Sequence, residues 1–190
     1  MQATPDLETE CGLHLTAVNR RLFSEMLDAH AEDPEGTYVA IPGFNKEIEA
    51  SPQISEFLFE LEVYSKSGRI HFWSIHDAGE FVGLVGIGDE LQMDESKWSL
   101  GYWVRASARR RGIARKSVNA VFNWVLKQSQ KVQIEITVHP QNVAGLATCR
   151  SICSKWGGRR AEPDFWPIEF GGRTVPHALW IVTLGGVPSD

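Results

Sequence analysis

A run of basic residues stands directly before a predicted helix. Residues 109–114 are Arg-Arg-Arg-Gly-Ile-Ala, and the apolar stretch 98–104 precedes them. The first amides of a helix lack intrahelical acceptors, and the helix dipole places partial positive charge at the same end. A strand, a short turn with glycine and a helix start therefore form an anion site. The consecutive arginines, with Arg115 one turn later, favour a ligand that carries several phosphates.

Two other phosphate-binding patterns do not fit the sequence. A P-loop requires Gly-Lys-Ser/Thr, which the chain lacks. A dinucleotide-binding fold requires Gly-x-Gly-x-x-Gly at the start of a helix. The glycine-dense stretch 83–88 instead runs into Asp89-Glu90, whose carboxylates would repel a phosphate. Its glycines therefore indicate a bulge or close packing. The third pattern, Arg/Gln-x-x-Gly-x-Gly/Ala between a strand and a helix, is satisfied by residues 109–114.

Candidate proton-transfer residues follow two predicted strands. Glu90 lies beside Asp89 after the stretch 81–88, and His139 comes directly after the stretch 132–138. With an ordinary pKa of about 6.5, histidine suits the role of proton acceptor near neutral pH. The alternative for Glu90 and Asp89 is an acidic loop exposed to solvent. The alternative for His139 is a loop histidine whose hydrogen bonds are made by backbone or water.

Two thiols and a hydroxyl lie on the predicted helix over 143–156. Cys149 and Cys153 share one helix face, with Ser151 between them. These groups are candidate proton donors, although small apolar residues at this spacing are also good core material. A metal site built from the cysteines and His139 would lack a fourth ligand, so we predict no metal.

Composition narrows the class of protein. The chain has 190 residues, 43% of them hydrophobic, which suits one well-buried domain. A formal net charge of −5 disfavours a general nucleic-acid binder, and no apolar run approaches the roughly 18 residues of a membrane span. The polar N-terminus is unlike a signal peptide, and three cysteines fit a reducing compartment. We expect a cytoplasmic protein with no membrane or nucleic-acid partner.

Hydrophobic periodicity predicts one mixed α/β domain over 1–190 that positions these residues. Strands are predicted at 13–17, 70–76, 81–88, 98–104, 132–138, 166–170 and 178–184, with an antiparallel hairpin at 70–88. Helices are predicted from the cap Asn19 to 33–36, from Ser51-Pro52 to 67–68, and over 113–128 and 143–156. Residues 1–10 are expected to be a flexible lead-in and 38–49 irregular.

Three stretches together resemble the GNAT superfamily of acetyl-CoA-dependent N-acetyltransferases, in its RimJ/RimL branch. They are the strand with Gly101-Tyr102-Trp103, the turn 109–114 and the sequence Val-His-Pro-Gln-Asn at 138–142. The resemblance implies an α/β (α+β) fold. It consists of a mixed, mostly antiparallel twisted sheet with helices on both faces and a splayed central strand pair.

The resemblance also implies where acetyl-CoA binds as co-substrate. The pyrophosphate would lie on the amides of the turn, the pantetheine arm along the strand before it, and the acetyl group in the gap of the splay. The implied cofactor-binding residues are Tyr102, Trp103, Val104, Arg109, Arg110, Arg111, Gly112, Ile113, Ala114, Arg115 and Asn142.

The chain departs from this family at positions that matter for catalysis. Relatives usually carry glycine at the position of Arg110, and many carry glutamate at that of Ser99. Close relatives can carry serine at the position of Gly145, and some place a tyrosine where Cys149 stands. The base and the acid therefore stay open among Glu90, His139, Cys149 and Ser151.

The predicted activity is direct acetyl transfer to a primary amine in a ternary complex. An α-amino group of a protein, peptide or aminoacyl compound is favoured by the resemblance, and the acidic stretch 89–95 would attract a cationic amine. The alternatives are a small-molecule or antibiotic acetyltransferase on the same fold and a non-catalytic CoA-binding sensor. A C-terminal strand hairpin is compatible with a homodimer.

Overall fold

Strands and helices are mixed along the chain in a computed structural model that describes residues 3–41, 43–68, 70–88, 98–128, 132–170 and 173–185. The strands are β1 (Leu7–Glu8), β2 (Leu13–Ala17), β3 (Ile70–Asp77), β4 (Glu80–Gly88), β5 (Trp98–Val104), β6 (Val132–Val138), β7 (Arg159–Arg160), β8 (Trp166–Phe170) and β9 (Arg173–Leu184). The helices are α1 (Phe23–Glu32), α2 (Pro34–Ala40), α3 (Ala50–Ser67), α4 (Ile113–Gln128) and α5 (Val143–Trp156), with 3₁₀ turns η1 (Arg20–Leu22) and η2 (Ala106–Ala108).

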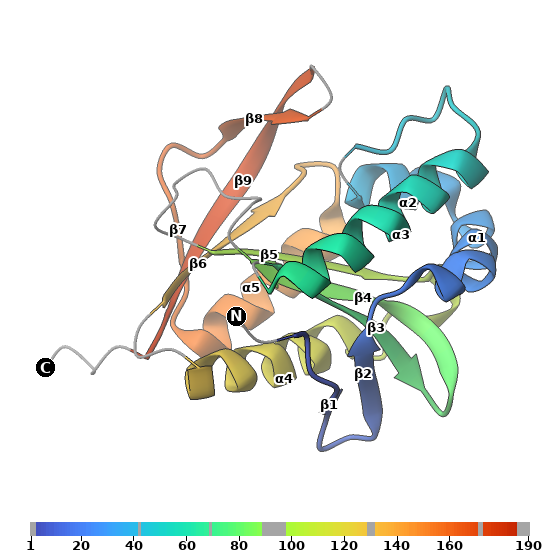
Figure 1. Ribbon diagram of the computed structural model, residues 1–190. Helices are drawn as coiled ribbons and strands as arrows, with labels where there is room; N and C mark the ends of the chain where they lie inside the picture. Colours follow the sequence, from blue (N-terminus) through green and yellow to red (C-terminus); the bar gives the residue numbers. More distant parts are fainter. Residues whose placement is uncertain are drawn as a thin grey trace, which may run out of the picture.

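The strands form a sheet in the order β1-β2-β3-β4-β5-β6-β9-β7, with β8 paired to β9. Among the described strands, each pairing is antiparallel except that of β5 with β6. The predicted mixed, mostly antiparallel sheet and its hairpin at β3–β4 are confirmed (Figure 1).

The parallel strands β5 and β6 separate after Ser99 and Glu135. Trp98 pairs with Ile134 and Ser99 with Glu135, and the ladder stops there. Beyond this point β5 stays paired with β4 up to Val104, while β6 stays paired with β9 along its whole length. The two strands therefore diverge, which confirms the predicted splay.

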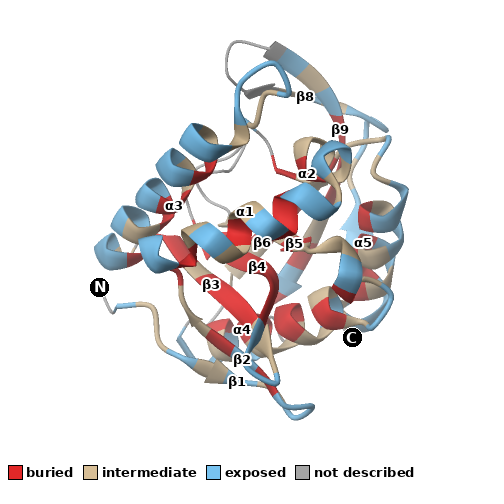
Figure 2. Cartoon of the chain, turned by 90° about the vertical axis from the view of Figure 1, so that its right-hand side faces the viewer, coloured by how far each residue is buried: buried red, intermediate tan, exposed pale blue. Residues whose placement is uncertain are grey.

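Helices cover both faces of the sheet, as predicted (Figure 1). Val118, Val121, Phe122 and Val125 recur at spacings of three and four residues, and this apolar stripe buries α4 against one face together with α5. On the other face α1 and α3 enclose a second apolar cluster around Trp103. Figure 2 shows the buried positions gathered in the sheet and on the inward sides of the helices. In the described part of the chain, no helix is long and apolar enough to cross a membrane.

Two N-terminal helices differ from the sequence prediction. Asp33 ends α1, as expected. Its side chain also accepts a hydrogen bond from the amide of Gly36 and caps α2. Part of the stretch expected to be irregular is therefore helical. Helix α3 begins at Ala50, one residue before the predicted start at Ser51-Pro52. The Gln53 side chain bonds carbonyls of the preceding loop, at Asn45, Ile48 and Glu49.

The N-terminal segment is attached to the sheet. No element was predicted before Leu13 and residues 1–10 were expected to be flexible, whereas β1 pairs with β2. The indole Nε1 of Trp73 donates to the carbonyl of Pro5 over 2.6 Å, and Thr4 Oγ1 lies 3.0 Å from His71 Nδ1. Because these partners lie 68 and 67 residues apart in the sequence, no local pattern could indicate them.

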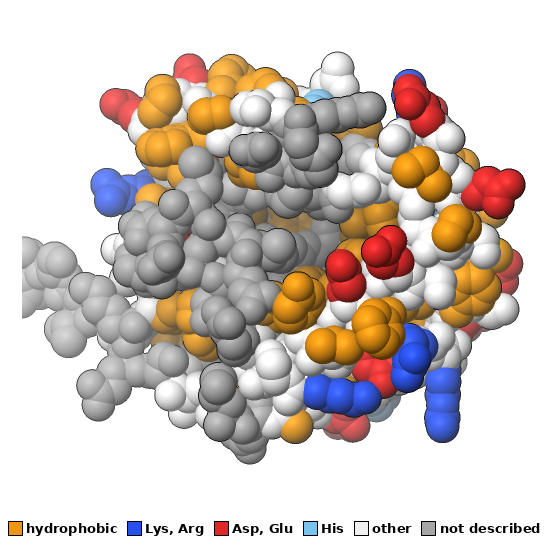
Figure 3. All heavy atoms as spheres, turned by 45° about the horizontal axis from the view of Figure 1, so that its top comes forward, with side chains coloured by type: hydrophobic (Ala, Val, Ile, Leu, Met, Phe, Trp, Pro, Cys, Tyr) orange, Lys and Arg blue, Asp and Glu red, His pale blue; other side chains and the backbone are white. Residues whose placement is uncertain are grey.

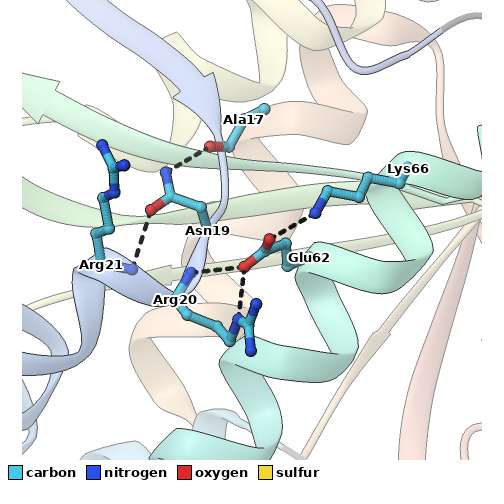
Figure 4. A network of polar contacts seen from close by, with 6 residues as sticks. All are labelled: Ala17, Asn19, Arg20, Arg21, Glu62 and Lys66. Atoms are coloured by element: carbon cyan, nitrogen blue, oxygen red, sulfur yellow. Dashed lines mark hydrogen bonds and ion pairs between the residues drawn. The ribbon is translucent and has the colours of Figure 1, made fainter.

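Glu62 fastens the start of the α1 segment to α3 (Figure 4). Its carboxylate accepts from the amide and Nε of Arg20, over 3.0 and 3.1 Å, and from Nζ of Lys66 over 2.6 Å. The hydrogen bond from Lys66, followed by that from the Arg20 amide, lowers the pKa of Glu62 to about 2. Asn19 was predicted to cap the first helix, but it caps the 3₁₀ turn η1 that leads into α1, since its side chain accepts from the amide of Arg21.

Gly83→Ala should destabilise the fold. A Cβ at this position would lie 2.3 Å from the backbone carbonyl oxygen of Trp103, so β4 and β5 would have to move apart. We expect the free energy of unfolding, measured by urea denaturation, to fall by about 1–3 kcal/mol. Gly101→Ala on the facing strand is the matched control, because nothing lies within 4 Å of its Cβ. Equal losses in the two variants would contradict this account of the β4–β5 contact.

Candidate active site

The turn between β5 and α4 has an unusual backbone conformation. Arg110 and Gly112 both adopt left-handed φ angles, of 63° and 72°. Glycine adopts such angles at little cost, whereas a side chain resists them. The family's usual glycine at the position of Arg110 therefore has a physical reason, and this chain keeps the conformation with an arginine.

The amides at the start of α4 point away from the helix without acceptors. The first helical bond runs from the amide of Lys116 to the carbonyl of Gly112, over 3.0 Å. For the amides of residues 112–115, no acceptor exists within the described ranges. Together with the helix dipole, these groups form a site for an anion at the end of β5.

Two arginines near the turn are paired with acidic residues at the α1–α2 junction. Arg105 donates to Glu32, and Arg109 donates to Asp33 and, through Nε over 3.2 Å, to the carbonyl of Val104. Because Asp33 also caps α2, its carboxylate joins that helix to the turn. These guanidinium groups brace the turn from the N-terminal third of the chain.

The other three cations of the turn differ in their partners. Arg111 is paired with Asp77 at the β3–β4 turn, and Arg115 donates to the hydroxyl of Ser151 on α5 over 3.3 Å. Arg110 is exposed and forms no ion pair with any residue that the structure describes. Of the consecutive arginines, Arg110 is thus the one whose guanidinium has no acidic partner within the described chain.

A cavity of 360 Å³ lies at the splay of β5 and β6. Seen from the end of the molecule that carries β8, the surface is hollowed, and hydrophobic and acidic side chains stand at the edge of the hollow (Figure 3). The cavity is lined on one side by α2 and α3 and on the other by the end of β6 and the loop after it. Its lining includes the apolar Ile41, Phe57, Leu61, Phe72 and Leu84 and the polar Glu60, Tyr64, Ser99, Tyr102, His139, Asn142 and His177.

Two histidines meet at one end of this cavity. Val138 of β6 pairs with Ala178 of β9, so His139 and His177 are neighbours across the two strands. Their rings pack edge to face with centroids 5.4 Å apart. Burial, and then the neighbouring His177, lower the pKa of His139. His139 was predicted as a candidate from the sequence, but His177 was not, because only the β6–β9 register brings it here.

The start of α5 closes the cavity near the splay. Asn142 Oδ1 accepts from the amide of Gly145 over 2.8 Å and caps the helix, and Tyr102 donates its hydroxyl to the carbonyl of Gly145 over 3.1 Å. Burial raises the pKa of Tyr102 well above its ordinary value. A Cβ at Gly145 would lie 2.6 Å from Nδ2 of Asn142, so the serine of close relatives would displace this cap.

The remaining candidates lie apart from the cavity or outside the described residues. Cys149 and Cys153 are buried in the core with their sulfurs 4.0 Å apart, and neither is among the cavity-lining residues. The hydrogen bond with Cys153, and burial, raise the pKa of Cys149. Ser151 accepts from Arg115 on the outer side of α5. Glu90 falls within 89–97, outside the described residues.

Comparisons with known proteins identify the family. The sequence pattern of the acetyltransferase (GNAT) domain matches residues 13–152, which is most of the chain. The protein therefore belongs to the GNAT acetyltransferases. No curated protein sequence matches it.

Solved structures of low sequence identity share the fold along nearly the whole chain. RimJ from Mycobacterium smegmatis, in complex with CoA-disulfide, has a TM-score of 0.73 at 21% identity and is matched over 100% of this chain and 90% of its own. The Salmonella typhimurium acetyltransferase that modifies the N-terminal serine of ribosomal protein L7/L12 has a TM-score of 0.74 at 13% identity, over 94% and 98%. The microcin C7 self-immunity acetyltransferase MccE, in complex with acetyl-CoA and AMP, has a TM-score of 0.67 at 11% identity, over 89% and 91%. The fold is thus that of RimJ/RimL-type acetyltransferases.

The ion pair at the α1–α2 junction should make part of the stability dependent on pH. Glu32 accepts from Arg105 and from the amide and hydroxyl of Ser107, and the Arg105 bond contributes most to lowering the pKa of Glu32 from 4.5 to about 2. A carboxyl with a depressed folded-state pKa stabilises fully above its ordinary pKa, and this contribution is lost as the pH falls through the folded-state value. Glu32 should therefore stabilise the fold above about pH 4.5 and lose its effect toward about pH 2.

Glu32→Gln should lower the free energy of unfolding near neutral pH by about 1 kcal/mol, since solvent still screens an ion pair whose side chains are 22% and 25% exposed. The difference from wild type, measured by urea denaturation at a series of pH values, should shrink toward zero at about pH 2. Glu62→Gln probes a separate network, so its loss should add to that of Glu32→Gln. A difference that is unchanged at the lowest pH would contradict the assigned ion pair.

Proposed function

We propose that this protein transfers the acetyl group of acetyl-CoA to a primary amine, with an α-amino group of a protein, peptide or aminoacyl compound as the acceptor. The observation that carries the proposal is the splay of β5 and β6. It opens a cavity along one edge of β5, and the strand leads into the acceptor-free amides of α4. Acetyl-CoA would supply an activated thioester. The chain's residues would bind acetyl-CoA, orient the amine and take up the proton that the amine loses.

The chain's groups fit the parts of acetyl-CoA. The amides of Gly112, Ile113, Ala114 and Arg115 would hold the pyrophosphate, and the side chains of Arg110 and Arg115 would add positive charge. The backbone of β5 is not paired with β6 beyond Ser99, so groups at Tyr102 and Trp103 are available to a polar arm laid along the strand. Arg109 and Arg111 would hold the turn in the conformation that presents its amides to the pyrophosphate. Asn142 would position the start of α5 beside the cavity through its cap.

The acceptor would enter from the side of α2 and α3. This wall of the cavity is mainly apolar, and Glu60 is its only described acidic residue. A carboxylate there attracts an ammonium group and disfavours an anionic acceptor. The RimJ/RimL-type relatives include one that modifies the N-terminal serine of a ribosomal protein, which supports a protein N-terminus as the acceptor.

Gly112→Glu should weaken acetyl-CoA binding, measured by isothermal titration calorimetry. A carboxylate at the start of α4 would oppose the pyrophosphate, and we expect Kd to rise about tenfold or more, which corresponds to about 1.4 kcal/mol or more. Gly112→Ala is the matched control, since it carries the same left-handed backbone strain without the charge. If both variants bind acetyl-CoA as tightly as wild type, the turn is not the pyrophosphate site.

A panel of amines should identify the acceptor class through release of the CoA thiol. We expect turnover with a peptide that has a free N-terminus and none with the same peptide when its N-terminus is blocked and an internal lysine is kept. Turnover confined to a polyamine or an aminoglycoside would contradict an α-amino acceptor. Tight binding of acetyl-CoA without turnover on any amine would favour a CoA-binding sensor instead.

A further inference from the structure

The floor of the cavity is a patch of sheet on which two neighbouring strands carry glycine. Phe72 of β3 pairs with Gly86 of β4, and Gly86 pairs with Gly101 of β5, so the three residues form one row across the sheet. Side chains alternate between the two faces of a strand, and Trp103, two residues after Gly101, packs in the cluster enclosed by α1 and α3. The row therefore faces the cavity, which all three of its residues line.

The two glycines differ in what stands over them. A Cβ at Gly86 would lie 2.1 Å from Cε1 of Phe72, so the ring of Phe72 already covers that position. At Gly101, no atom of the described residues lies within 4 Å of the Cβ position, and the backbone has no left-handed φ that would require glycine. Because protein interiors are close-packed, an open position on a central strand is space that a bound molecule can fill.

This open position lies beside the place where the central strands separate. In the described chain β5 has no pairing with β6 beyond Ser99, and Gly101 follows two residues later. The proposed function places the thioester along this edge of β5. Since adjacent strands are about 4.8 Å apart, the space between this edge and the Phe72 ring over β4 is about one strand spacing wide. It fits a single side chain on the carbon that carries the reacting amine.

Apolar side chains enclose this space. Helix α3 presents Phe57 and the buried Leu61, one turn apart, to the cavity. Leu84 and Trp103 pair with each other in the next row of the sheet, line the cavity and are each 4% exposed. An apolar group gains free energy by leaving water for such surroundings, whereas an unpaired charge loses it. The walls therefore favour an apolar side chain.

The polar groups of α3 stand at the rim of the cavity. Glu60 and Tyr64 lie one helical turn apart, line the cavity and are exposed. The carboxylate of Glu60 attracts an approaching ammonium group, and the hydroxyl of Tyr64 can bond to the backbone of a peptide. From rim to floor the lining changes from charged and polar to apolar. This order matches an amine that carries an apolar substituent.

The geometry points to the space over Gly101 as the pocket for the acceptor's first side chain. The acceptor is accordingly a primary amine with a bulky apolar group on the adjacent carbon, as in a peptide that begins with leucine or phenylalanine. This inference rests on the proposed function. Gly101 sets the depth of the pocket and the ring of Phe72 closes its far side, so these two residues determine specificity.

The first test compares wild-type turnover on peptides that differ only in their N-terminal residue. Release of the CoA thiol is measured with peptides that begin with leucine, phenylalanine or alanine. Because the added carbons enter an apolar pocket, we expect kcat/KM for the leucine and phenylalanine peptides to exceed that for the alanine peptide by about tenfold or more. Equal values, or a preference for alanine, would overturn the inference while leaving the proposed function in place.

The second test fills the pocket in steps with Gly101→Ala and Gly101→Val. No described atom lies within 4 Å of the Cβ position, so the first added methyl displaces nothing. We expect kcat/KM for the leucine peptide to fall about tenfold or more in Gly101→Val and less in Gly101→Ala, with a smaller change for the alanine peptide. Val63→Ala is the matched control, because Val63 lies on α3, is 47% exposed and does not line the cavity. Equal losses for the two peptides would overturn the inference.

Binding of the products separates recognition of the acceptor from the chemistry. N-acetylated leucine and alanine peptides are titrated into CoA-loaded protein by isothermal titration calorimetry. The leucine product should bind wild type about tenfold or more tightly than the alanine product, and this ratio should shrink in Gly101→Val. Thermal midpoints and the Kd of acetyl-CoA, measured on the same samples, report whether the variant folds and holds the donor.

The outcomes distinguish the inference from the function on which it rests. Equal affinities of wild type for the two products would overturn the inference alone, provided that wild type acetylates an α-amine. Failure of wild type to acetylate any amine would count against the proposed function itself and would overturn the inference with it.

Discussion

Among the described residues, the parallel pairing of β5 with β6 ends at Ser99 and Glu135, and the rest of the site depends on this end. Each strand keeps its antiparallel partner on the other side, so the sheet stays continuous while the central pair opens. Backbone groups that a regular sheet would pair internally are left along the edge of β5. The cavity, the two histidines and the start of α5 are all arranged around that opening.

The turn after β5 is held mainly by internal charge pairs. Arg105 and Arg109 meet acidic residues at the α1–α2 junction, and Arg111 meets Asp77. These pairs neutralise much of the positive charge that the sequence concentrates there. In the proposed site, recognition of an anion would then rest chiefly on the amides at the start of α4, and the paired arginines would hold the turn in place. The N-terminal third of the chain thereby supports a site to which it contributes no amide.

Local patterns predicted the elements that carry the site. Strands 13–17, 98–104 and 132–138 and helices 113–128 and 143–156 match the structure at both ends, because clean alternation, a continuous apolar stripe and glycine stops coincide there. Helix α2 was missed because Asp33-Pro34 was interpreted only as a helix end, whereas the same aspartate caps the next helix. The ion-pair partners of the arginines and the position of His177 depend on contacts between segments far apart in sequence, which periodicity does not encode.

The candidate site is built from two segments that lie far apart in the sequence, and the register of β9 against β6 brings the second of them to the cavity. The groups that would hold the nucleotide lie between β5 and α4 in the middle of the chain, whereas His177 arrives on the last long strand. A different hairpin at this end would bring a different side chain to the cavity, while the turn between β5 and α4 stayed unchanged. Changes in the C-terminal hairpin can therefore alter the chemistry of the cavity in such enzymes, while the turn that would bind their common acyl donor is kept.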